Sequence, residues 1–189
     1  MAQPIAVDNQ ETEWIRRARR DDAAAWEQIV RRYQRPVFRL AFLILGEAAD
    51  AEEIAQEAFV RAYLSLDYFD EDRPFRPWVL QITRNLARNR RRSLGRYWAN
   101  LRRWWQKQPE PVEHSSGQQR DNARLLWQAV RQLKPAWQEA IYLRYFLDLS
   151  EAEMATALDI APGTVKSRLH RGLAALKELV EQDFNELIE

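Results

Sequence analysis

The stretch Leu149 to Arg171 reads LSEAEMATALDIAPGTVKSRLHR, and its pattern predicts two short helices joined by a tight turn. Ser150 is expected to cap the first helix, and Glu153 three residues later completes a capping box. Asp159 stands at the turn, because Asp tolerates the left-handed backbone conformation better than most residues. Pro162 suits the first position of the second helix, where its missing N–H costs nothing. The stretch therefore predicts a helix-turn-helix.

The second helix of this motif has an apolar face and a basic face. Its apolar residues recur at spacings of three and four and are expected to pack inward: Val165, Leu169, Leu173 and Leu176. The polar residues that then point toward solvent or a DNA major groove are Thr164, Lys166, Ser167, Arg168, His170 and Arg171. Lys and Arg can donate to guanine O6 and N7, and a hydroxyl near the helix N-terminus can reach a phosphate. A helical hairpin with a solvated basic face is the alternative that spacing alone leaves open.

Composition favours an all-helical protein and excludes several classes of site. The chain has 189 residues, 46% hydrophobic and 30% charged, with 5 glycines and no alternating run of β-branched residues. It has no cysteine, which excludes disulfides, thiolate catalysis and Cys-based zinc sites. Its 2 histidines, His114 and His170, argue against a His-rich metal centre, and we expect no cofactor. The chain starts without a signal pattern and its longest apolar run, residues 40–45, is too short to span a bilayer, so we expect a cytoplasmic protein.

The net charge of +1 conceals a strong segregation of charge along the chain. Acids dominate from Glu47 to Asp72, where Arg61 is the one basic residue. From Arg73 to Pro109 there is no acid, and the segment holds eleven Arg and Lys residues. Such polarity indicates two different partners, one basic and one anionic, and nucleic acid is the obvious anionic candidate.

The first part of the chain predicts a series of amphipathic helices. Asp21 and Asp22 can start a long helix that Pro36 is expected to kink or end. Residues 37–45 are almost all apolar and should be buried, and Gly46 should end the segment.

A second helical region follows, with a polar loop between two helices. Asp50 and Glu53 repeat the capping-box pattern and open a helix whose other face shows acids. A polar loop covers residues 66–75, and Pro77 can begin the next helix. On that helix the inward residues are Trp78, Ile82 and Leu86, and the outward ones are Arg84, Asn85, Arg88 and Asn89.

Two segments of this sequence resemble one known family. DIAPGTVKSRLHRGLAAL (residues 159–176), preceded by LRYFLDLSEAEMA (143–155), resembles the promoter-reading C-terminal domain of sigma-70 family RNA polymerase sigma factors, and most closely the extracytoplasmic-function group. DAEEIAQEAFVRAYLSLDYF (50–69), followed by FRPWVLQITRNLARNRRR (75–92), resembles the region of the same family that binds the polymerase clamp and reads the −10 element. Two motifs in the right order are much more specific than either alone.

The resemblance implies an all-α fold of two small helical domains joined by a flexible linker, with the helix-turn-helix in the C-terminal domain. The expected order is a disordered tail (1–10), sigma region 2 (11–95), a linker (96–120) and sigma region 4 (121–189). It implies a transcription initiation factor that performs no chemistry and takes no small-molecule substrate. The implied partners are core RNA polymerase, through its clamp and flap, promoter DNA, and an anti-sigma factor.

The resemblance also assigns roles to residues. Those expected to read the −35 element lie on the second helix of the helix-turn-helix, the recognition helix: Thr164, Lys166, Ser167, Arg168, His170 and Arg171. Those expected at the −10 element are Phe69, Arg84, Asn85, Arg88, Asn89 and Arg91, because strand opening needs an aromatic to pack a displaced base, an amide to read its edge and cations along the backbone. Those expected to dock on the polymerase clamp are Asp50, Glu53, Gln56 and Glu57.

The sequence is also compatible with two other functions, and it does not decide the role of one segment. The chain could be a stand-alone helix-turn-helix regulator whose first half dimerises or senses a ligand. Its acids could form a two-metal nuclease site, although no Lys or His accompanies them. The Trp-rich basic segment 96–107 could enter polymerase channels, stack on single-stranded DNA, or lie on a membrane or a partner helix.

Overall fold

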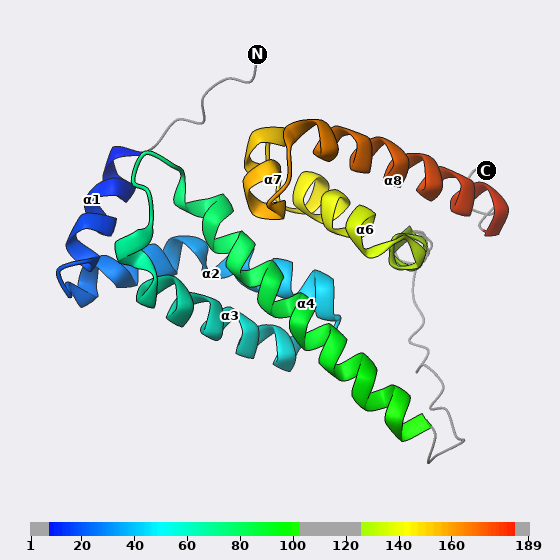
Figure 1. Ribbon diagram of the computed structural model, residues 1–189, viewed down its shortest axis with the longest axis horizontal. Helices are drawn as coiled ribbons and strands as arrows, with labels where there is room; N and C mark the ends of the chain where they lie inside the picture. Colours follow the sequence, from blue (N-terminus) through cyan, green and yellow to red (C-terminus); the bar gives the residue numbers. More distant parts are fainter. Residues whose placement is uncertain (1–7, 103–125, 184–189) are drawn as a thin grey trace, which may run out of the picture.

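The computed structural model describes residues 8–102 and 126–183, and these residues form helices and connecting turns without a strand (Figure 1). The first half, residues 8–102, contains α1 (Asn9–Ala18), α2 (Ala23–Leu45), α3 (Ala48–Leu64), the short 3₁₀ helix η1 (Leu66–Tyr68) and α4 (Phe75–Arg102). The second half, residues 126–183, starts with a helical stretch over 126–132 and continues with α6 (Pro135–Ile141), the π-helical turn η2 (Tyr142–Phe146), α7 (Glu151–Leu158) and α8 (Pro162–Asp183). The predicted all-α class with a helix-turn-helix is confirmed.

The helix starts follow the capping residues in two of three predicted places. Asp22 accepts hydrogen bonds from the N–H groups of Ala24 and Ala25 at 3.0 and 3.1 Å and begins α2. Ser150 and Glu153 form the predicted capping box of α7. The capping box predicted at Asp50 is wrong, because Glu47 caps α3 and Asp50 lies inside its first turn. The acid-rich start of α3 offers several possible caps, and local pattern alone cannot choose among them.

Helix α2 continues past Pro36, so an end at this residue is wrong, while the predicted end at Gly46 is confirmed. An internal proline costs a helix about 3 kcal/mol. The buried residues on either side of Pro36, which include Tyr33, Val37 and Leu40, pack in the core and offset that cost. Gly46 ends the helix with φ 81°, a left-handed conformation that glycine adopts without strain.

In the first half, α2 is the central element and packs against α1, α3 and α4. The α2 residues Ile29, Val37 and Ala41 are fully buried, as are Ala51 and Ala58 of α3. Small alanines on α3 let the helix axes approach closely. Residues 37–45 are not buried throughout as predicted, because Phe42 keeps 39% of its surface exposed. A regular helix turns about 100° per residue, so a continuous apolar run must bring some residues to the surface.

In the second half, α8 packs on α6 and α7. Val165 is buried and Leu169 and Leu176 are partly buried as predicted, but Leu173 is 40% exposed. Gly172 faces α6 instead, where an added Cβ would lie 3.2 Å from the Cβ of Trp137. The helix therefore approaches α6 through a residue without a side chain, which a pattern of apolar residues cannot reveal.

The described residues of the two halves pack against each other, with α4 lying between α2 and α3 on one side and α7 on the other (Figure 1). Helix α1 begins at Asn9, inside the expected tail, and α4 begins two residues before Pro77 and continues to Arg102, beyond the expected end of the first domain. Residues 103–125, which include most of the expected linker, lie outside the described residues, as do the side chains of the Trp-rich segment. No helix in the described part of the chain is long and apolar enough to cross a bilayer.

Candidate nucleic-acid interface

The basic face of α8 lies at the surface of the second half. Thr164, Lys166, His170 and Arg171 are exposed, and Ser167 and Arg168 are half-buried. The outward orientation predicted for this face is confirmed at the four exposed residues, while contact with DNA stays a prediction. Lys166 has an ion pair with Glu151 of α7 at 3.6 Å, in which both side chains remain largely exposed. Such a surface pair is weak, so it leaves the lysine available to another anion.

The turn between α7 and α8 fixes how that face is presented. Asp159 adopts the predicted left-handed conformation, with φ 55° and ψ 53°. The N–H of Ile160 then donates back to the carbonyl of Ala155 at 3.0 Å, which closes the end of α7. Because Pro162 starts α8 two residues later, the angle between the two helices is set by a short and well-bonded turn.

The loop between η1 and α4 does not present Phe69 as predicted. Phe69 is only 5% exposed and packs against Phe75 and Trp78, with ring centroids 5.5 and 4.7 Å away. Its neighbour Tyr68 is 91% exposed. The exposed position predicted for Phe69 is therefore wrong, while a role of this residue at the −10 element stays a prediction.

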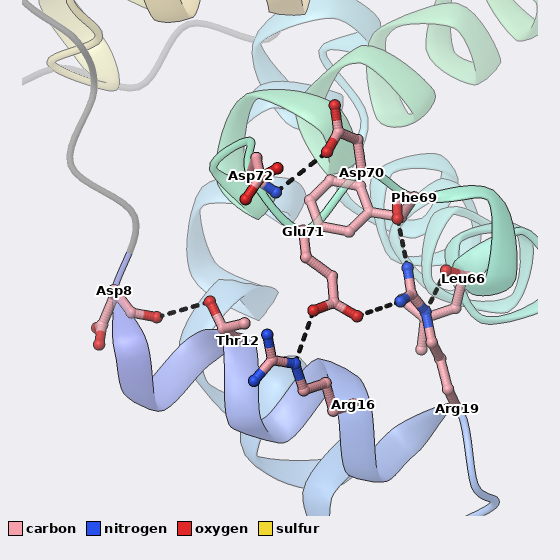
Figure 2. Close-up of polar contacts among 9 residues, drawn as sticks. All are labelled: Asp8, Thr12, Arg16, Arg19, Leu66, Phe69, Asp70, Glu71 and Asp72. Atoms are coloured by element: carbon pink, nitrogen blue, oxygen red, sulfur yellow. Dashed lines mark hydrogen bonds and ion pairs between the residues drawn. The ribbon is translucent and has the colours of Figure 1, made fainter.

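Helix α1 holds this loop through arginines that sequence reasoning missed (Figure 2). Arg19 donates through Nε to the carbonyl of Leu66 at 2.9 Å, and its other N–H groups reach the carbonyl of Phe69 and the carboxylate of Glu71. Arg16 donates to Glu71 at 2.7 Å. These partners are about fifty positions apart in the chain, so no local pattern could have indicated the contact.

The polar face of α4 is divided between surface and interior. Asn85 and Asn89 are exposed, and Arg91 is half-buried. The outward orientation predicted for Arg84 is wrong, because Arg84 is buried and its Nε lies 2.7 Å from Glu139 of α6. Arg88 is also near Glu139, at 3.5 Å. The second half packs on this side of α4, and the sequence pattern of α4 alone cannot predict that contact.

The acidic face of α3 is likewise divided. Asp50 accepts two hydrogen bonds from Arg90 of α4, at 2.9 and 2.5 Å, and Glu53 accepts one at 3.0 Å. The hydrogen bond and negative charge of Asp50 raise the pKa of Arg90. Gln56 and Glu57 are exposed, and Glu57 pairs with Arg61 of the same helix. Only part of the predicted docking face is therefore free of contacts with α4.

Gln56 also lines a groove between α2 and α3 with a volume of about 400 Å³. Its wall is mainly apolar, and its lining residues are Val30, Gln34, Arg35, Phe38, Glu52, Ala55, Gln56 and Phe59. The structure shows Phe59 mostly buried and Phe38 half-buried, so both rings can form the floor of a surface groove.

A metal site is not formed by the described residues. Within residues 8–102 and 126–183, no group of three or more His, Asp or Glu side chains is placed to hold a metal ion. Asp50 of α3 and Glu71 of the loop before α4 are instead paired with arginines, at 2.5 and 2.7 Å.

Comparison with known proteins gives two family matches and a set of full-length relatives. Residues 29–97 match the model for Sigma-70 region 2, and residues 123–176 match that for Sigma-70, region 4. The chain is 32% identical over 174 residues to the ECF RNA polymerase sigma factor SigW of Bacillus subtilis (strain 168), covering 87% of this chain and 93% of the relative. It is 33% identical over 176 residues to the RNA polymerase sigma factor NccH of Alcaligenes xylosoxydans xylosoxydans, covering 88% and 92%.

Two solved structures share the fold at 23% identity. CnrH in complex with the cytosolic domain of CnrY has a TM-score of 0.70 and covers 93% of this chain and 99% of that chain. The sigma factor RpoE in complex with the anti-sigma factor NepR from Bartonella quintana has a TM-score of 0.64 and covers 83% and 97%. These likenesses extend across both halves of the chain.

Proposed function

This chain belongs to the extracytoplasmic-function group of sigma-70 RNA polymerase sigma factors, and from that premise we propose that it binds core RNA polymerase and directs the enzyme to particular promoters. The observation that carries the proposal is the presence of both sigma regions, in order, with an exposed basic recognition helix in the second. The chain itself performs no chemistry. It acts in the cytoplasm, where the polymerase transcribes.

In this proposal α8 reads the −35 element. Lys166 and Arg171 contact base edges, and Thr164 and Ser167 contact phosphates near the start of the helix. Arg168 and His170 flank these contacts. The exposed surface of α8 supports this assignment, because most of these side chains can reach a major groove without any change in the packing of α8 on α6.

The −10 element is read by the loop of residues 66–74 and by α4. Asn85 and Asn89 are exposed and can read base edges, and Arg91 can contact the phosphate backbone of the DNA. The ring of Phe69 supports the loop from within and meets a displaced base only if the loop opens. Arg84 and Arg88 can reach DNA only when Glu139 is withdrawn, because that carboxylate occupies them now.

The polymerase clamp docks on the groove between α2 and α3. Its apolar floor gives contact area, and the polar rim at Gln56 and the neighbouring Glu57 gives complementarity to a basic partner. Asp50 and Glu53 act from the edge of this surface, where they also hold Arg90. The second half contacts the polymerase flap. An anti-sigma protein is a further partner, by likeness to the complexes of CnrH and RpoE.

Binding to core polymerase tests this proposal. The purified chain mixed with core enzyme lacking any sigma factor should elute as a stable complex in gel filtration. Gln56→Arg places a cation against the basic partner and should weaken binding by about tenfold or more, because like charges that face each other across an interface repel. The matched control is Gln182→Arg at the exposed far end of α8. Failure of the unmodified chain to form the complex would exclude the proposed function.

A further inference from the structure

The side chain of Arg19 reaches the loop of residues 66–74 from the side of α1 (Figure 2). Its guanidinium donates to the carbonyls of Leu66 and Phe69 and to the carboxylate of Glu71, and only 22% of the side chain is exposed. Arg16 holds the same carboxylate from the next turn of α1. One side chain therefore fixes the loop backbone on both sides of Tyr68.

These contacts require a guanidinium. Its N–H donors lie in a fixed plane and can reach two carbonyls and a carboxylate at once, whereas a lysine ammonium is a compact point charge on a flexible stem. The ring of Phe69 is anchored in the core below, so Arg19 is the main polar contact that sets the path of the loop above it. The exposed Tyr68 follows that path.

We propose that Arg19 is a positioning residue for promoter opening, which holds the loop in the shape that receives the separated strand at the −10 element. This inference rests on the proposed function of the loop. Arg19, the C-cap residue of α1, lies ten residues before residue 29, where the match to sigma region 2 begins. The end of α1 therefore adds a part to the strand-opening unit that the matched region does not contain.

The test compares Arg19→Ala and Arg19→Lys with Arg20→Ala, which removes the same charge from the adjacent exposed position. Each variant is assembled with core polymerase on one promoter. Affinity for core is measured first, and unpaired thymines at the −10 element are then counted by permanganate reactivity. Arg19→Ala should reduce opening by about tenfold or more, the effect of losing a hydrogen bond to a charged group, with core affinity unchanged. Arg19→Lys should recover only part of the opening.

Three outcomes decide the inference. Normal opening by Arg19→Ala, beside an active unmodified chain, overturns the positioning role and leaves the proposed function intact. Parallel loss of core affinity and opening in both Arg19 variants overturns it as well, since the residue would then only support the fold. An unmodified chain that neither binds core nor opens a promoter removes the proposed function, and the inference with it.

A second inference comes from an independent observation, the buried ion pair between the two halves. Arg84 of α4 and Glu139 of α6 lie 2.7 Å apart, with side chains 7% and 1% exposed. The Oε1 atom of Glu139 is buried without a hydrogen-bond partner among the described residues, and Arg88 lies 3.5 Å from it. Arg76 of α4 also donates to the carbonyl of Leu147 at 2.5 Å, across the same boundary.

A buried ion pair of this kind contributes little net free energy to the docking of the two halves. Burial removes both charges from water, and their attraction only roughly repays that cost. When the halves separate, both groups return to water, so neither charge is left buried without a partner. The pair therefore fixes how the halves dock without making the docking permanent.

We infer that this pair is a reversible latch that competes with promoter DNA for Arg84 and Arg88. The closed chain keeps the exposed recognition helix but withdraws these two arginines from the −10 element. Opening of the latch on the polymerase frees them. This second inference also rests on the proposed role of α4.

Distance measurement on the free chain tests the latch. The sequence has no cysteine, so Glu13→Cys and Lys177→Cys give a single pair of spin labels, one on each half. The closed chain should give a narrow distance distribution. Glu139→Gln and Glu139→Arg should broaden it toward longer distances. The exchanged pair Arg84→Glu with Glu139→Arg should restore it in part, because Arg88 still faces position 139 as a like charge. Glu27→Gln is the matched control, because it removes an exposed carboxylate within the first half.

A distribution in Glu139→Arg that equals that of the unmodified chain overturns the latch, provided circular dichroism shows the same helix content in both. Broadening in the exchanged pair as large as in Glu139→Arg alone overturns it too, because opposite charges at these two positions would then not restore the docking. These distances do not depend on polymerase, so failure of the proposed function would appear separately, as absent core binding with the latch distances unchanged.

Discussion

At the scale of single residues, two buried tyrosines should make the free energy of unfolding decrease at alkaline pH. Tyr142 is 1% exposed in the second half, and burial raises its pKa from 10.0 to about 12. Tyr33 lies in the core of the first half, where burial and its hydrogen bond to Glu11 raise its pKa. Both phenols stay neutral in the folded chain at a pH where the unfolded chain has begun to ionise.

The sign of the effect follows from these shifts. A pKa that is higher in the folded state gives a stabilisation that is complete below the unfolded value, near pH 10, and is lost as pH rises toward 12. We therefore expect the free energy of unfolding to fall between pH 10 and 12, and to fall less steeply in Tyr142→Phe. Urea unfolding at several pH values measures this. Tyrosine absorbance showing all 6 tyrosines ionising together near pH 10 would contradict it.

Two exposed cations of the recognition helix α8 should contribute directly to recognition of the −35 element. Lys166→Ala and Arg171→Ala should each weaken −35 recognition by the assembled polymerase by ~1–3 kcal/mol, because each removes a donor to base or phosphate. Lys177→Ala, farther along α8, is the control and should leave recognition unchanged. The measurement is competition between promoters with an intact and a scrambled −35 element. Unchanged discrimination in both variants would remove α8 from promoter reading.

Single residues could be predicted from sequence where the deciding partner is local. Ser150, Asp159 and Pro162 have the expected conformations, because capping and turn geometry depend on neighbours within a few positions. Phe69 and Arg84 differ from expectation, because their burial depends on elements distant in the chain.

At the scale of elements, the packing of α8 on α6 depends on Gly172. An added Cβ there would lie 3.2 Å from Trp137 Cβ and 3.5 Å from Ile141, so a larger side chain must push the helices apart. Gly172→Leu should lower the free energy of unfolding by about 1–3 kcal/mol, the usual cost of overpacking.

The control for this prediction is Ala174→Leu, two positions along at an exposed site of the same helix. It should change stability by less than about 0.5 kcal/mol. Chemical denaturation of the three proteins compares them. Equal stability of Gly172→Leu and Ala174→Leu would show that α8 and α6 do not approach through this glycine.

The helices themselves could largely be predicted, but their limits and burial could not. Amphipathic periodicity placed α2, α3 and α8 in the right segments. Pro36 does not end α2, because packing of the flanking residues against α3 and α4 outweighs a local penalty. Leu173 should have faced inward, and Gly172 takes that place because the approach of α6 requires a small residue.

At the scale of the whole molecule, the sequence predicted two helical domains but not the contact between them. Charge segregation and the two motifs pointed to separate acidic and basic partners. The structure adds that α4 is shared, since its residues contact α2 and α3 on one side and the second half on the other. The ion pair of Arg84 and Glu139 joins residues 55 positions apart, and each residue alone resembles an ordinary solvated charge in sequence.

Transcription from a promoter library by core polymerase, with and without this chain, tests the central claim most directly. Adding the chain should produce new transcripts from a small set of promoters that share one −35 and one −10 element at fixed spacing. The chain alone should bind those promoters poorly, because each half offers few contacts. Transcript starts that do not change when the chain is added, or tight promoter binding by the chain without polymerase, would contradict the account.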